Sequence, residues 1–331
     1  MPTAATPMAF ARQIVAACER GGVDPAEPLR QAQITPSALR LAQGRITARQ
    51  METLSGAAMQ ALDDEGLGAF RRRLPWGSYG MLARASISAP TLGVAVARWC
   101  RHHRLIVDDL TLRLSEQGPV AAISIEEHSA LNGQREFCLV HVLRNIHGLA
   151  CWLVDSRIPL LGASFPFAPP PHAEAYAHLF PGPRRFGAQR AEIRFEAAYL
   201  QLPLRRDERA LRLMLQRALP LTVLPYRRDR LLVQQVRQAL AAHPEDTHNA
   251  EGLATRLHLS VRTLHRQLRE EGARLQSLKD EVRHQRAREL LLRSRLPIKQ
   301  IAAAVGFRNE KSFLRAFRAW AGVGAGELRR H

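Results

Sequence analysis

The chain has 331 residues, of which 46% are hydrophobic and 24% are charged, as in globular proteins long enough for two domains. This composition excludes a disordered chain, and the longest apolar run, Gly148–Val154, is far shorter than the roughly 20 residues that span a bilayer. Arg12 and Gln13 interrupt the apolar residues near the start, so no signal peptide is predicted. The sequence therefore predicts a cytoplasmic protein with no membrane partner.

The chain is strongly basic, with 48 Lys and Arg against 30 Asp and Glu and a net charge of +18. Residues 227–331 hold 22 of these basic residues against 11 acidic ones, which is more than half of the net charge. A GC-rich genome would explain the preference for Arg over Lys but not the excess of cations. The charge therefore predicts a polyanionic partner and association with the nucleoid.

Residues 1–220 combine helical and strand patterns. Apolar residues recur at helical spacing over residues 8–65, Thr91–His103 and Phe137–Val154. A β-hairpin is predicted around Glu116–Pro119. The strands predicted are Leu110–Leu114, Val120–Ile125, Leu160–Phe167 and Glu192–Phe195, and the further helices are His172–Leu179 and Asp207–Leu219. This mixture predicts an α+β domain.

The histidines and cysteines of this region form no recognisable catalytic or metal site. His141 and His147 lie six residues apart on one predicted helix, so they do not share a face. The four cysteines have no zinc-type spacing and are predicted to be buried. No GxSxG, HExxH or glycine-rich phosphate loop occurs, so the sequence predicts no enzyme, no metal and no cofactor. An effector pocket needs only an apolar cavity and a few polar groups, and no pattern identifies its residues.

Beyond a linker predicted at residues 221–230, the chain contains an internal repeat. Leu253-Ala254-x-x-Leu257-x-Leu259 matches Ile301-Ala302-x-x-Val305-x-Phe307 at an offset of 48, and Leu264-x-Arg266-x-Leu268 matches Phe313-x-Arg315-x-Phe317 at an offset of 49. Each copy is predicted to form a helix-turn-helix unit, about residues 250–271 in the first copy and about 297–320 in the second. Residues 231–331 are thus predicted to form an all-α domain.

Both copies are predicted to present a recognition helix. Ser260 and Asn309 are placed to cap the second helix of each copy. Between the copies, Leu275–Arg293 is predicted as a continuous linker helix of roughly 25–30 Å. A connector of that length would hold the two recognition helices about one turn of DNA apart.

This part of the chain resembles the C-terminal DNA-binding domain of AraC/XylS-type bacterial transcription regulators. The resemblance is carried by Arg286-Ala287-x-x-Leu290-Leu291, by Ile298-x-x-Ile301-Ala302-x-x-Val305-Gly306-Phe307 and by Ser312-Phe313-x-Arg315-Ala316-Phe317-Arg318-x-Trp320-x-Gly322-Val323. The chain departs from the family at Gly324-Ala325, where regulators of this type carry Ser or Thr followed by Pro. Loss of that proline is expected to loosen the C-terminal cap of the domain.

Residues 10–215 are similar to the arabinose-binding-type regulatory domain that some of these regulators carry. The similarity is carried by Leu92-Gly93, His172-x-x-x-Tyr176, Phe186 and Leu202-Pro203-Leu204. The resemblance implies a sequence-specific activator that binds double-stranded promoter DNA and RNA polymerase. It also implies a small-molecule effector, which the sequence does not identify, and a homodimer.

The residues expected at the DNA surface lie on or just before the two recognition helices. They are Ser260, Arg262, Thr263, His265, Arg266, Arg269, Asn309, Glu310, Lys311, Ser312, Arg315 and Arg318. Arg266 and Arg315 occupy equivalent places and are expected at guanine edges, with phosphate contact alone as the alternative. A carboxylate at Glu310 can accept from cytosine N4 but repels phosphate, so its contact stays open.

Two other functions remain open at this point. In one, the first domain acts on a small molecule as an enzyme and the basic domain tethers it to DNA, which would require a paired nucleophile and base. In the other, the chain coats DNA without sequence preference. Footprinting on one promoter and on random DNA separates this second alternative from a regulator.

Overall fold

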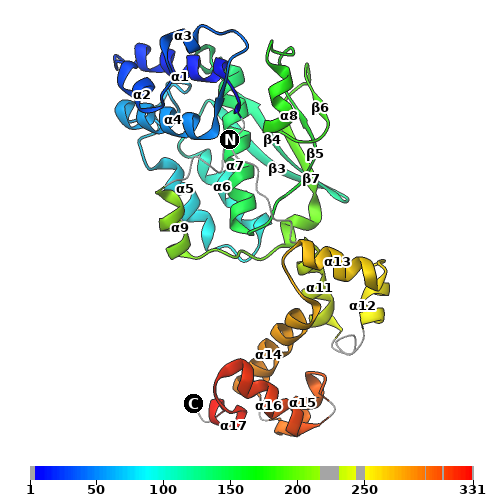
Figure 1. The fold of residues 1–331 in the computed structure, drawn as a ribbon. Helices are drawn as coiled ribbons and strands as arrows, with labels where there is room; N and C mark the ends of the chain where they lie inside the picture. The colour runs from blue at the N-terminus through cyan, green and yellow to red at the C-terminus, as the bar shows by residue number, and fades with distance from the viewer. Residues whose placement is uncertain (1–3, 217–230, 244–249, 295, 308, 330–331) are drawn as a thin grey trace. The chain divides into compact units, whose positions relative to one another are not determined.

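The computed structural model describes residues 4–216, 231–243, 250–294, 296–307 and 309–329. The chain divides into two compact units, Met1–Arg228 and Asp229–His331 (Figure 1). The linker predicted at residues 221–230 lies outside the described residues. Within the described ranges, no helix is both long and apolar enough to cross a membrane.

The first unit begins with helices built around a small two-stranded sheet. The helices are α1 (Met8–Arg20), α2 (Ala26–Gln31), α3 (Pro36–Leu39) and α4 (Ala48–Leu62), and the antiparallel strands are β1 (Ala4–Pro7) and β2 (Arg45–Thr47). Thr47 starts α4 through a capping box: its Oγ1 accepts from the Gln50 N–H at 3.2 Å, and the Gln50 side chain accepts from the Thr47 N–H at 3.0 Å. The helical pattern predicted over residues 8–65 is therefore interrupted by β2, because this segment pairs with β1.

A five-stranded sheet follows, with strand order β3-β4-β7-β5-β6. Its strands are β3 (Leu110–Gln117), β4 (Val120–Glu127), β5 (Leu160–Ser164), β6 (Arg184–Arg185) and β7 (Ala191–Glu196). The predicted hairpin is confirmed, and it turns at Gly118, where φ is +58°. Strand β5 ends at Ser164 rather than at Phe167, because Pro166 has no N–H to continue the ladder.

In its described part, the first unit is completed by the helices α5 (Ser78–Ile87), α6 (Leu92–His103), α7 (Arg135–Leu153), α8 (Tyr176–Leu179) and α9 (Glu208–Leu215). Helix α7 contacts both α6 and β7, and its buried side chains lie on every face. The helix predicted over His172–Leu179 is instead a 3-10 turn, Ala173–Ala175, followed by the short α8. Helix α9 ends at Leu215, and the last residues of the predicted Asp207–Leu219 helix lie outside the described residues. Helix α5 was not predicted.

The second unit is helical throughout its described part. Its helices are α11 (Leu231–Ala242), α12 (Ala250–Arg256), α13 (Val261–Glu270), α14 (Leu275–Arg293), α15 (Ile298–Ala304), α16 (Glu310–Ala321) and α17 (Ala325–Leu328). They surround two separate apolar cores, one around Leu253, Leu264 and Leu268 and one around Phe313 and Phe317. The predicted fold class, an α+β unit followed by an all-α unit, is confirmed.

Two helices of this unit were not predicted. Helix α11 adds four buried side chains to the first core, and its start is capped by Glu271, which accepts from the N–H groups of Leu232 and Val233 at 3.1 and 2.8 Å. Helix α17 closes the second core with the fully buried Ala325. The chain thus forms a C-terminal helix at the place where it departs from the family pattern.

Candidate nucleic-acid interface

Helix α13 is fixed by a cap at its start and by apolar side chains on one face. The Ser260 Oγ accepts from the Thr263 N–H at 3.1 Å and lies 2.8 Å from the Thr263 hydroxyl oxygen. Leu264 and Leu268 follow one turn apart and are fully buried in the first core. These contacts set the rotation of the helix, and His265 and Arg266, which lie between the two leucines, are exposed.

The outward face of α13 is cationic. Arg262, His265, Arg266 and Arg269 are all exposed. In the described part of the chain, no carboxylate forms an ion pair with Arg262 or Arg269. This face therefore offers guanidinium groups to an anionic partner, and guanidinium suits both phosphate and guanine.

Helix α16 repeats the plan with an aromatic interior. The Asn309 Oδ1 accepts from the Ser312 N–H at 2.8 Å, and Phe313 and Phe317 are fully buried. The helix ends at Gly322, whose φ of +73° is the left-handed conformation that terminates helices. The second recognition helix is thus held, like the first, by a side-chain cap at its start and by two buried residues one turn apart.

The outward face of α16 carries charges of both signs. Lys311, Arg315 and Arg318 are exposed, while Ser312 is half-buried. Glu310 is exposed in the first turn, where a carboxylate stabilises the positive end of the helix dipole. That position gives Glu310 a role in the helix itself, independent of any contact with a base.

Arg266 and Arg315 are equivalent in geometry as well as in sequence. Each lies midway between the two buried residues of its helix, two positions from either. Two helical positions correspond to a rotation of about 200°, so each arginine projects from the side opposite its core. The structure brings both to the exposed side of their helices.

Helix α14 connects the two cores as one continuous element. Leu275 and Leu278 belong to the first core, and Ala287 and Leu291 belong to the second. Two carboxylates of α14 bond within the helix: Glu289 pairs with Arg286 at 3.4 Å, and Asp280 accepts from Gln276 at 2.9 Å. A third, Glu281, pairs with Arg237 of α11.

Aromatic contacts also fix α14 to the second core. The Arg283 guanidinium lies 5.2 Å from the ring of Phe307, and the ring centre of His284 lies 5.5 Å from that of Phe317. Burial lowers the pKa of both side chains, so His284 is neutral near pH 7. The helix is therefore tied to both helix-turn-helix units at the same time.

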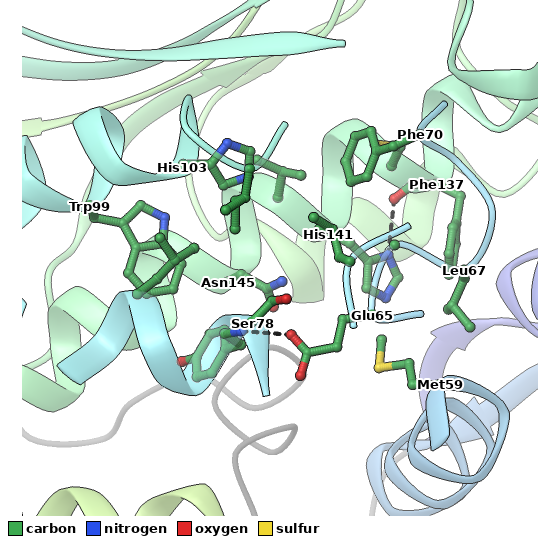
Figure 2. A pocket seen from close by; sticks show the side chains of 17 residues that line it. Met59, Glu65, Leu67, Phe70, Ser78, Trp99, His103, Phe137, His141 and Asn145 are labelled. Atoms are coloured by element: carbon green, nitrogen blue, oxygen red, sulfur yellow. Dashed lines mark hydrogen bonds between the residues drawn. The ribbon is translucent and has the colours of Figure 1, made fainter. Parts of the chain in front are cut away.

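The first unit contains a cavity, shown in Figure 2. Its walls come from the loop after α4 and from helices α5, α6 and α7, and they include Glu65, Trp99, His103, His141 and Asn145. Burial lowers the pKa of His103 and of His141 to about 4, so both imidazoles are neutral near pH 7. Sequence patterns did not find these residues as a group, since they come from four segments with no shared spacing.

Two expectations about the remaining residue types can be compared with the structure. All four cysteines are buried and free, as predicted. In the described part of the chain, no group of three or more His, Cys, Asp or Glu side chains is placed to hold a metal ion.

Comparison with known proteins decides the family. Residues 22–204 match the arabinose-binding N-terminal domain of AraC transcription regulators, and residues 253–331 match a helix-turn-helix domain. The chain belongs to the AraC family of transcription regulators. The resemblance predicted from the sequence is therefore confirmed, and the family is one of regulators, not of enzymes.

Relatives of this AraC-type regulator are found over its whole length and over its second unit alone. The ornithine utilization regulator of Pseudomonas aeruginosa is 26% identical over 317 residues, which cover 96% of this chain and 94% of the relative. The HTH-type regulator VqsM of the same organism is 33% identical over 98 residues, 30% of each chain. The crystal structure of the regulator CdpR, also from P. aeruginosa, covers 95% of this chain and 98% of its own, at 22% identity and a TM-score of 0.37.

Family membership assigns both units a general role. The second unit is a helix-turn-helix DNA-binding domain, and the first is a ligand-binding domain for a small-molecule effector. The twelve residues predicted at the DNA surface lie on the two recognition helices or at their caps. Their individual contacts with DNA remain predictions.

Proposed function

We propose that this regulator activates transcription by placing α13 and α16 in successive major grooves of promoter DNA. The observation that carries the proposal is the equivalence of Arg266 and Arg315, which project away from two separate cores. Helix α14 joins those cores as a continuous rod of roughly 25–30 Å. A spacing of this order matches one turn of B-DNA, about 34 Å.

The residues of the interface divide by their place on the helices. Arg266 and Arg315 contact guanine edges, while Arg262, His265, Arg269, Lys311 and Arg318 contact phosphates. Ser260, Thr263, Asn309 and Ser312 lie at the helix starts, where backbone N–H groups attract phosphate oxygens. Glu310 is assigned to the N4 amino group of a cytosine.

The proposal includes RNA polymerase as a partner, a homodimeric state and a place in the cytoplasm at the nucleoid. An activator bound at a promoter must act where polymerase and DNA meet. For dimerisation, β3 lies at an edge of the sheet and has one hydrogen-bonded neighbour, β4, among the described strands. An edge strand can pair with a strand of a second copy.

The test uses the full chain with genomic fragments of its own source. Bound fragments are recovered, footprinted and used as templates for transcription with RNA polymerase. We expect a few discrete protected sites and increased transcription from them when effector is present. Uniform protection of all fragments would show a nucleoid-coating protein, and specific protection with reduced transcription would show a repressor.

A fragment of the chain tests whether the second unit is sufficient for DNA binding. Residues 227–331 should fold alone, as seen by circular dichroism, and shift DNA in a gel at low salt. A folded fragment that binds no DNA would contradict the assignment of the interface to this unit.

A further inference from the structure

The cavity of the first unit has the size of a small organic molecule. The space open to the centres of water-sized spheres is about 80 Å³. Because about 10–15 Å³ of this measure holds one water, the cavity has room for roughly five to eight atoms of that size. Its walls are mostly apolar and aromatic, with Phe70, Tyr79, Trp99 and Phe137 among them.

One acidic side chain faces this space. Among the lining residues, all of them described, Glu65 is the one carboxylate, and the imidazoles of His103 and His141 are neutral near pH 7. No cationic side chain lines the cavity, although the chain as a whole carries a charge of +18. Burial raises the pKa of Glu65, the hydrogen bonds from the N–H groups of Gly77 and Tyr79 oppose this, and the nearby Asp64 and Asp63 add to the rise. A cation in the cavity would relieve both effects.

Glu65 is held in place by backbone groups and keeps hydrogen-bonding capacity. Its two carboxylate oxygens accept from the N–H groups of Gly77 and Tyr79 at 2.7 and 2.6 Å. A carboxylate has about four lone-pair positions, so about two remain. In the described part of the chain, Glu65 forms no ion pair with a cationic side chain.

The loop that carries Glu65 is fixed around a buried carboxylate. Asp64 accepts from the N–H groups of Gly66, Gly68 and Leu74 at 2.8 to 3.0 Å. Within this loop the buried Leu67 has a φ of +51°, a conformation that is rare for a branched side chain. Strained residues of this kind persist where the surrounding structure fixes them, often at ligand sites.

A second polar group at the cavity lacks a partner. His103 is 6% exposed, lines the cavity, and its Nδ1 has no hydrogen-bond partner. A buried polar atom without a hydrogen bond is destabilising, so a ligand that bonds to this ring is favoured. Figure 2 labels His103, Trp99, Glu65 and His141 among the side chains that line this cavity.

We infer that this cavity binds a small primary amine with an apolar tail, with its ammonium group at Glu65 and its tail among the aromatic rings. The inference rests on the proposal that the first unit senses a small molecule, and it names the chemical class of that molecule. Ammonium groups are also attracted to the faces of Trp and Tyr rings, which supports the same orientation.

Other ligand classes fit these walls less well. A carboxylic acid would meet Glu65 and no cationic side chain. An amino acid would bury its carboxylate without a counter-charge. A sugar such as arabinose needs many hydrogen-bonding partners, and most of the lining is apolar.

Glu65 also has a structural role at the start of α5, since its two donors lie at the N-terminus of that helix. The variant Glu65→Gln separates the two roles, because it removes the charge and keeps one oxygen acceptor. Glu19→Gln, at the exposed end of α1, is the matched control.

The test measures thermal unfolding and titration calorimetry of the full chain with n-pentylamine, 1-pentanol, hexanoate, norleucine and L-arabinose at millimolar concentrations. Pentylamine should raise Tm by about 2 °C or more, whereas the other four should not. Glu65→Gln should weaken pentylamine binding by at least about tenfold, and Glu19→Gln should leave it unchanged.

Stabilisation by norleucine, hexanoate or arabinose in place of pentylamine would overturn the inference, as would an absence of any binding or full retention of binding by Glu65→Gln. The panel on the native chain decides the matter even where Glu65→Gln does not fold. DNA binding by the same preparation is measured in parallel. If pentylamine does not bind while specific DNA binding is intact, only the inference of an amine ligand is overturned. If the chain shows no specific DNA binding, the proposed function is overturned.

Discussion

The two units of the chain differ in where their notable ionisable side chains lie. In the first unit they lie in the interior, and in the second unit they lie on the surface. The first unit buries His103 and Arg144 and half-buries His141 and His147, and the Arg144 guanidinium donates to the Leu179 carbonyl at 2.8 Å. The second unit has apolar cores, and Lys279 is the one buried polar side chain among its described residues. Most of the other cationic side chains among its described residues are exposed.

This difference matches two kinds of partner. Neutral imidazoles in a dry interior offer hydrogen bonds to a molecule small enough to enter. Exposed guanidinium groups attract a polyanion that cannot enter, and they do so without specific pockets. The first unit is therefore expected to bind its partner in its interior and the second unit to bind its partner on its surface.

The largest expected effect is acid sensitivity of the first unit. The pKa values of His103, His141 and His147 are lowered by burial to about 4, from about 6.5 in the unfolded chain. The unfolded state therefore binds protons first, and stability is lost as the pH falls from about 6.5 to about 4. Between pH 7 and pH 5 each histidine should remove on the order of 2 kcal/mol from the free energy of unfolding.

Urea unfolding followed by tryptophan fluorescence measures this loss, since Trp76, Trp99 and Trp152 lie in the first unit. His147→Gln should reduce the pH dependence, and the exposed His258→Gln should not. Equal stability at pH 7 and pH 5 would contradict the buried, neutral state of these rings.

The next effect concerns salt and the second unit. With about six or more phosphate contacts, DNA affinity should fall about a thousandfold or more between 50 and 200 mM salt. The double variant Arg262→Gln/Arg269→Gln on α13 should lower the salt slope by about two, and Lys311→Gln/Arg318→Gln on α16 should do the same. Fluorescence anisotropy at several salt concentrations measures the slopes, and a flat dependence would show that the cationic faces do not meet the backbone.

A smaller loss is expected from the arginines opposite the cores. Arg266→Ala and Arg315→Ala should each cost about 1–3 kcal/mol in binding to the selected site. Binding to random DNA should remain nearly intact, because these arginines are assigned to base edges. The two losses are compared by anisotropy on both kinds of DNA, and equal losses on both would assign the arginines to phosphate.

The smallest effect separates capping from DNA contact. Asn309→Ala and Ser260→Ala each remove a cap, which should lower the free energy of unfolding by about 1 kcal/mol. The variant Asn309→Ser keeps a cap oxygen and adds no charge, so its free energy of unfolding should stay close to that of the native chain. If Asn309→Ser unfolds normally and still loses DNA affinity, the Asn309 amide contacts DNA directly as well as capping the helix.

The sequence was most informative where it repeats. The repeat fixed which residues of α13 and α16 are buried, because Leu264, Leu268, Phe313 and Phe317 recur at one helical turn. Ser260 and Asn309 were identified as caps from residue type and position alone, and both caps are present. Local patterns of this kind depend on neighbours three or four residues away.

The cavity was not predicted because it depends on distant contacts. Glu65 and Leu67 lie in a loop whose conformation is set by Asp64 and by Gln134, which donates to the Leu67 carbonyl at 3.0 Å from 67 residues away. Helix α5 was not predicted for a related reason, since Gly77 and Gly80 weaken its pattern while tertiary contacts hold it. Such features have no spacing by which a sequence can reveal them.

Selection of binding sites from randomised DNA tests the central claim most directly, namely that the two recognition helices each read a base about one turn apart. The native chain, Arg266→Ala and Arg315→Ala are selected in parallel. Each variant should lose preference at one base pair, and the two affected pairs should lie about 10 apart. An unchanged sequence preference in both variants would contradict the claim.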